Sequence, residues 1–62
     1  MAGEIYLEFV VQGNAVRVTA IDKASGTEAV VMGPAGAARA ALEAAALRKL
    51  RYVMQKKRDA GG

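Results

Sequence analysis

The chain has 62 residues, of which 53% are hydrophobic, and a net charge of +3 at pH 7, with neither cysteine nor histidine. The lack of both residue types excludes disulfides, thiolate zinc sites and cysteine or histidine catalysis. A domain this short buries only about 60% of the surface of its unfolded chain. Oligomerisation is a common way to gain the missing stability. We therefore expect one domain over residues 1–62 and favour a homodimer.

Membrane insertion and export are not expected. No apolar stretch reaches the 18 or so residues of a membrane span, and the N-terminal segment MAGEIYLEF lacks a basic region followed by an apolar one. We expect a cytoplasmic protein without a membrane span.

Two strands are predicted at the start of the chain, at about residues 4–12 and 15–22. Apolar side chains recur at every second position in both, as in a sheet with one buried face. Gly13-Asn14 lies between them and suits a two-residue type II′ turn, which has Gly at its first central position. That turn pairs Gln12 with Ala15 and so fixes the register.

A third strand is predicted at about residues 27–32, after a turn over residues 23–26. Gly26 suits a position with positive φ, and Asp22 can accept hydrogen bonds from its own turn. Pairing Asp22 with Thr27 aligns the apolar residues of all three strands on one face, which we call the helix side. Its residues are Ile5, Leu7, Phe9, Val11, Val16, Val18, Ala20, Ala29 and Val31.

The opposite face, which we call the outer face, is also rich in apolar residues. A sheet face in contact with water is normally polar, whereas this one is expected to carry Tyr6, Val10, Ile21, Val30 and Met32. Contiguous exposed apolar surface tends to mark an interaction site, although single exposed apolar residues are normal. We predict an interface with a partner here.

One long helix is predicted at about residues 35–57, with Gly33 as its N-cap and Pro34 in its first turn. Its apolar face is expected to hold Leu42, Ala46, Leu50, Val53 and Met54. The helix would be about 34 Å long and a strand about 23 Å, so we expect it to project beyond the sheet from about Leu50. Residues 59–62 are expected to fray. The projecting part would offer Leu50, Val53 and Met54 to a partner.

The predicted fold class follows from these elements. It is α+β, a three-stranded antiparallel meander packed by one long C-terminal helix.

Positive charge belongs to the helix, since residues 1–33 carry a net charge of −2 and residues 34–62 one of +5. The candidate nucleic-acid contacts are Arg48, Arg51, Lys56 and Lys57, with Tyr52 available for stacking. Cations near the C-terminus of a helix are also favoured by its dipole, and a run of charge is commonly a solvated face. Both interpretations stay open at this point.

No enzymatic constellation is recognisable. Glu4 and Glu8 share the outer face, but they are more simply solvated or paired with Arg17. The segment GPAGAARA lacks the Lys-Ser/Thr ending of a phosphate-binding loop. We predict no catalytic residues, no metal, no cofactor and no small-molecule substrate.

The order strand-strand-strand-helix, with the segment GPAGAARAALEAAALRKLR, resembles the plant AP2/ERF domain and the N-terminal domains of some phage-type integrases. The resemblance implies DNA binding by the sheet face, where those families carry arginines and tryptophans. Here that face has Arg17 as its only basic residue. The whole chain, from MAGEIYLEFVVQGNAVRVTAID to AALRKLRYVMQKK, resembles a group of short uncharacterised proteins of alphaproteobacteria, which implies only a complete small protein.

The sequence thus favours a non-enzymatic protein-interaction module, either a homodimer or an adaptor. The alternative is a nucleic-acid-binding protein that uses the basic C-terminal helix. Dimerisation through the outer face and through the helix are both open.

Overall fold

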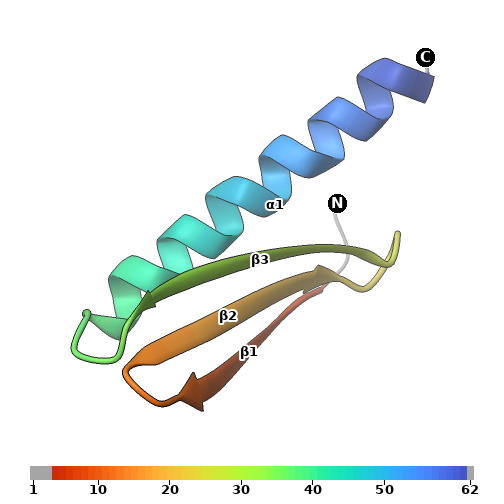
Figure 1. Cartoon of the computed structure of the whole chain (residues 1–62). Helices are drawn as coiled ribbons and strands as arrows, with labels where there is room; N and C mark the ends of the chain where they lie inside the picture. The colour runs from red at the N-terminus through yellow and green to blue at the C-terminus, as the bar shows by residue number, and fades with distance from the viewer. Residues whose placement is uncertain (1–3, 62) are drawn as a thin grey trace.

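Three antiparallel strands and one helix form the fold, in a computed structural model that describes residues 4–61 (Figure 1). The strands are β1 (Ile5–Gln12), β2 (Ala15–Asp22) and β3 (Thr27–Pro34), and the helix is α1 (Arg39–Gly61). The sheet order is β1-β2-β3, so each strand pairs with its neighbour in the chain. The predicted α+β meander is confirmed.

The register agrees with the sequence prediction residue by residue. Gln12 pairs with Ala15, and Asp22 with Thr27. Gly13 has a φ of 61° and is followed by a residue with negative φ, which is the sign pattern of a type II′ turn. Gly26 has a φ of 76°. The side chains that we assigned to the helix side and to the outer face therefore alternate as expected.

The start of the helix was predicted wrongly. Pro34 is not in the first turn of the helix but at the end of β3, where it pairs with Ala15. Proline is tolerated at such a strand end because its missing N–H is not needed there. The backbone turns after Pro34, and the carbonyl of Ala38 accepts the first helical hydrogen bonds, from Ala41 and Leu42.

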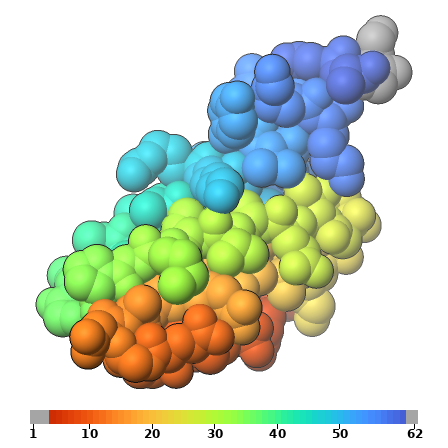
Figure 2. Space-filling model, in the orientation of Figure 1, coloured from red at the N-terminus to blue at the C-terminus, as the bar shows by residue number. Residues whose placement is uncertain are grey.

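The end of the helix also lies later than predicted. α1 continues to Gly61, whereas we expected residues 59–62 to fray; residue 62 lies outside the described residues. Its 23 residues span about 34 Å, against about 26 Å for an eight-residue strand. Figure 2 shows the C-terminal end of the helix extending beyond the sheet. Within residues 4–61, no helix is long and apolar enough to cross a membrane.

The core lies between the helix and two of the three strands. Its buried members are Val16, Val18, Ala20, Ala29, Ala46 and Leu50. The alanines allow the helix to approach the sheet closely, and Gly33 meets the side chain of Leu42 in the same layer. Burial of such side chains, at about 25 cal/mol per Å² of apolar area, is the main stabilising contribution.

The helix does not cover the whole sheet. α1 packs most extensively on β3 and less on β2, and it leaves β1 largely uncovered (Figure 1). A helix is about 10 Å wide with its side chains, whereas three strands spaced about 4.8 Å apart are wider. One helix therefore leaves one strand of this sheet exposed on the helix side.

Candidate interaction surfaces

The outer face holds all five apolar residues predicted for it. Tyr6 lies directly opposite Ile21, while Val10, Arg17 and Met32 form a row across the three strands. Tyr6 and Met32 are 55% and 57% exposed. The two most exposed of these five residues thus lie at opposite ends of a diagonal across the outer face.

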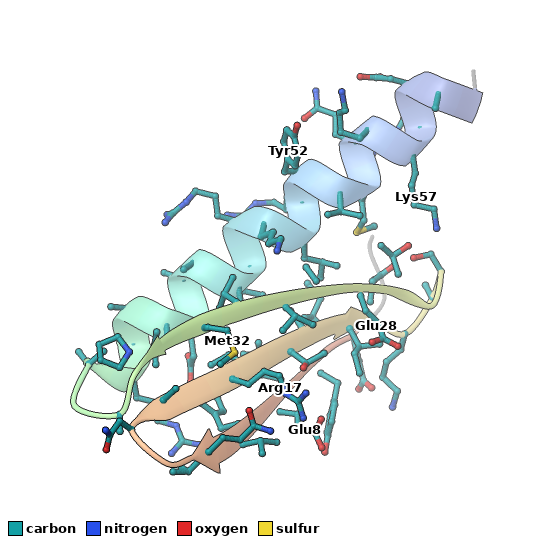
Figure 3. All side chains as sticks on the ribbon, in the orientation of Figure 1. Glu8, Arg17, Glu28, Met32, Tyr52 and Lys57 are labelled. Carbon is teal, nitrogen blue, oxygen red and sulfur yellow. The ribbon has the colours of Figure 1, made fainter. Side chains whose placement is uncertain are left out.

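Charged side chains interrupt this apolar surface. Glu8, Arg17 and Glu28 lie on the side of the sheet away from the helix (Figure 3). No ion pair within the described residues joins Arg17 to Glu4 or Glu8, and Glu4 lies instead 3.6 Å from Lys23. The outer face therefore offers apolar groups together with unpaired charges of both signs.

The apolar end of the helix is less available than predicted. Leu50 has no exposed surface and belongs to the core, so the expectation that the helix projects from Leu50 is wrong. Val53 and Met54 are half-buried and pack against the same core. The physical reason is that the helix begins later on the sheet than expected, which brings its second half over the strands.

Two basic side chains hold the helix to β3. Lys49 Nζ donates a hydrogen bond to the carbonyl oxygen of Val30 at 2.7 Å. Lys57 Nζ donates to Thr27 Oγ1 at 3.3 Å, and it points towards the turn between β2 and β3 (Figure 3). Lys57, predicted as a nucleic-acid contact, is thus directed to the sheet. The hydrogen bonds of Lys49 and Lys57 could not be predicted from the sequence, because a run of basic residues does not show which acceptor each side chain will bind.

The other predicted basic contacts face solvent. Arg48, Arg51 and Lys56 are exposed, and Tyr52, which is 61% exposed, points away from the sheet (Figure 3). Arg51 and Arg58 flank a shallow hollow of about 240 Å³ that Met54 and Gln55 also line. The structure therefore brings two guanidinium groups to one hollow on the helix.

A polar cluster fills the turn between β2 and β3. Asp22 Oδ2 accepts hydrogen bonds from the backbone N–H and the hydroxyl of Ser25, at 3.2 and 2.6 Å. Asp22 and Thr27 are buried, and the hydroxyls of Ser25 and Thr27 are 2.8 Å apart. Asp22 thus accepts hydrogen bonds from its own turn, as the sequence predicted. Within residues 4–61, no group of three acidic residues is placed to hold a metal ion.

A further apolar surface was missed by the sequence analysis, and it lies on the helix side of β1. Val11 is 69% exposed and Ile5 is 40% exposed, although both were assigned to the covered face. A hollow of about 200 Å³ opens beside Val11, between the end of β1 and the start of α1. The guanidinium of Arg39 lies 4.1 Å from the centre of the Phe9 ring at this hollow. The width of a helix relative to three strands could have revealed this surface.

Comparison with known proteins adds a family to this description. No curated protein and no solved structure matches the chain. A family model described as a domain of unknown function, DUF6898, matches residues 2–57 and so covers the whole sheet and most of the helix. The chain belongs to the DUF6898 family.

Proposed function

We propose that this protein is a small non-enzymatic interaction module that forms a homodimer through the outer face of its sheet. The observation that carries the proposal is the exposure of Tyr6 and Met32 on that face, which also holds Val10, Ile21 and Val30. These groups lose contact with water if two sheets pack face to face, at the usual spacing of about 10 Å.

The charges on the outer face also suit a second copy. Arg17 lies on the central strand, and Glu8 and Glu28 lie on the two flanking strands. Under a twofold axis that runs across the strands, the row of Arg17 in one copy lies over the row of Ile21 and Glu28 in the other, so Arg17 of each copy comes close to Glu28 of its partner. A self-complementary arrangement of this kind is what a symmetric dimer requires.

The size of the face sets the expected strength. Three strands of eight residues cover about 14 by 26 Å, so the flat area is about 370 Å² for each copy. The pair then buries less than the 1,200–2,000 Å² or so that is typical of stable complexes. We expect a dimer that dissociates in the micromolar range.

Sedimentation between 1 and 200 µM tests this function. We expect the average mass to rise from 6.4 kDa towards twice that value as the concentration increases. Met32→Lys and Tyr6→Lys should keep the chain monomeric by burying a charge in the interface. Val11→Lys is the matched control, because Val11 is even more exposed, at 69%, but lies on the other side of the sheet. A monomer throughout, or equal loss with the control, rejects the proposal.

A second candidate function is nucleic-acid binding by the helix. The hollow between Arg51 and Arg58, with Arg48, Lys56 and Tyr52 exposed nearby, favours it because guanidinium groups bind phosphate and an aromatic ring can stack on a base. Binding to a fluorescent 20-nucleotide single strand should weaken steeply with salt. Arg48→Gln with Arg51→Gln should abolish it, whereas Arg17→Gln, on the outer face of the sheet, should not. No binding at about 50 mM salt rejects this candidate.

A further inference from the structure

β1 has a free edge along its whole length. It is the outermost strand of the sheet, so β2 satisfies the backbone groups on one side only. A two-residue turn makes its flanking residues a hydrogen-bonded pair, and here these are Gln12 and Ala15. Backbone groups alternate in direction along a strand. The even-numbered residues of β1 therefore bond to β2, and the N–H and C=O groups of Ile5, Leu7, Phe9 and Val11 point outward.

The other edge of the sheet differs in this respect. β3 lies under α1, and Lys49 caps the outward carbonyl of Val30. Lysine at a sheet edge is a known protection against the addition of further strands. Within residues 4–61, α1 leaves β1 largely uncovered apart from Arg39 over Phe9, and no lysine side chain bonds to an outward carbonyl of β1. No proline or glycine interrupts its eight residues. The structure thus leaves one edge open for pairing.

The side chains along this edge form half of a groove. Ile5 and Val11 are exposed, and Leu7 and Phe9 are half-buried, all on the helix side. At the C-terminal end of β1 the groove leads into the hollow of about 200 Å³, whose lining includes Phe9, Val11, Val16, Ala37 and Leu42. This volume accommodates one large apolar side chain.

A positive charge stands at the same hollow. The guanidinium of Arg39 is placed over Phe9 and lines the hollow. Among the residues that the structure describes, no carboxylate forms an ion pair with it. A guanidinium on an aromatic face still presents its N–H groups at its rim, and these match a carboxylate geometrically.

We propose that the free edge of β1 binds an extended segment of another protein by strand addition. The segment carries a large apolar residue that enters the hollow and, two positions along on the same face, an aspartate or glutamate that pairs with Arg39. Residues two apart in a strand lie on one face about 7 Å apart. This is recognition by main-chain hydrogen bonds for affinity and by alternate side chains for specificity.

A second copy of this chain does not supply that segment. Two β1 strands that pair through their outward, odd-numbered residues keep the even-numbered residues of both copies on the outer face. Both acidic residues near this strand, Glu4 and Glu8, are even-numbered and would lie on the side away from Arg39. Charge complementarity therefore favours a foreign acidic segment.

The test is a titration of the ¹⁵N-labelled full chain with synthetic nonapeptides, followed by NMR. The probe is the peptide Thr-Val-Thr-Leu-Thr-Glu-Thr-Val-Thr, in which valine, leucine, glutamate and valine share one face of the strand. We expect shift changes at the amides of Leu7, Phe9 and Val11 and at Nε of Arg39. A peptide with lysine in place of the glutamate should bind at least 5-fold more weakly, and Arg39→Gln should remove that preference.

A pair of variants isolates the backbone contribution. Val11→Pro removes an outward N–H at an exposed position without removing any bond to β2, so the chain should stay folded and bind at least 10-fold more weakly. Val11→Thr keeps the N–H and should bind as the original does. A dispersed spectrum confirms the fold of each variant.

Three results would overturn the proposal. They are equal binding of the glutamate and lysine peptides, undiminished binding by Val11→Pro, and shift changes at β1 that follow the concentration of the chain alone, which would indicate pairing with a second copy. Met32→Lys, which tests the outer-face dimer, should leave peptide binding unchanged. The two proposals therefore fail separately.

Discussion

The edge formed by β3 lies beneath α1, whereas, within residues 4–61, the edge formed by β1 is largely uncovered (Figure 1). Val18 on β2 and Ala29 on β3 lie beneath the helix and are buried, while Val11 and Ile5 on β1 remain exposed. Similar side chains in one alternating pattern thus have different energetic roles. The difference teaches that strand pattern alone does not determine burial; the position of the helix does.

Leu50→Ala should have the largest effect on this comparison. Truncating a fully buried leucine costs about 2–5 kcal/mol, which is a large share of the stability of a small domain. Val11→Ala is the control on the bare edge and should change the free energy of unfolding by less than about 0.5 kcal/mol. Urea unfolding followed by circular dichroism measures both. Equal losses would show that the helix does not cover β3 in preference to β1.

Gly33→Ala should destabilise the covered edge by about 1 kcal/mol, because a Cβ at Gly33 would overlap a terminal methyl of Leu42, which must change its rotamer to make room. The cost should shrink when Leu42→Ala is also present, since the clash is then relieved. Gly36→Ala is the control, because nothing lies near its Cβ position. Unfolding midpoints of the four variants provide the test, and strictly additive losses would contradict the contact.

Lys49→Met should cost about 0.5–1 kcal/mol, the usual net value of one hydrogen bond. It also removes the charge that protects the edge of β3. We therefore expect it to raise concentration-dependent association, measured by light scattering. Lys56→Met is the matched control, as Lys56 is exposed on the same helix. An identical response of the two variants would argue against a protective role of Lys49.

Glu4→Gln should have the smallest effect. It removes the 3.6 Å ion pair with Lys23, whose two side chains are largely exposed, and such pairs contribute little. The thermal midpoint should not change measurably, and Lys23→Gln should behave in the same way. A clear loss with both variants would show that this pair fastens the open end of β1.

Much of the fold follows from local sequence patterns. Alternation and the two turns at Gly13 and Gly26 determine the strands and the register, because a shift of one residue would reverse every side chain. The start of the helix was harder, because Pro34 suits both a helix start and a strand end. The pairing of Ala15 with Pro34 makes Pro34 the end of a strand. That pairing is a tertiary contact, which local sequence patterns do not reveal.

The candidate surfaces were predicted only in part. The outer face follows from alternation, so Tyr6 and Met32 could be assigned from the sequence. The burial of Leu50, the bond from Lys57 to Thr27 and the exposure of Val11 depend on where the helix lies across the sheet. That placement results from packing between residues far apart in the chain, for which periodicity carries no information.

The meander order has a consequence for how the chain folds. Both strand pairings join neighbours in the sequence across turns of two and four residues, so little loop entropy is lost in forming them. Only the docking of α1 joins distant parts of the chain. Low contact order of this kind is associated with folding in milliseconds or faster. The backbone groups that the meander pairs are then open to unwanted pairing with unfolded neighbours for only a short time during folding.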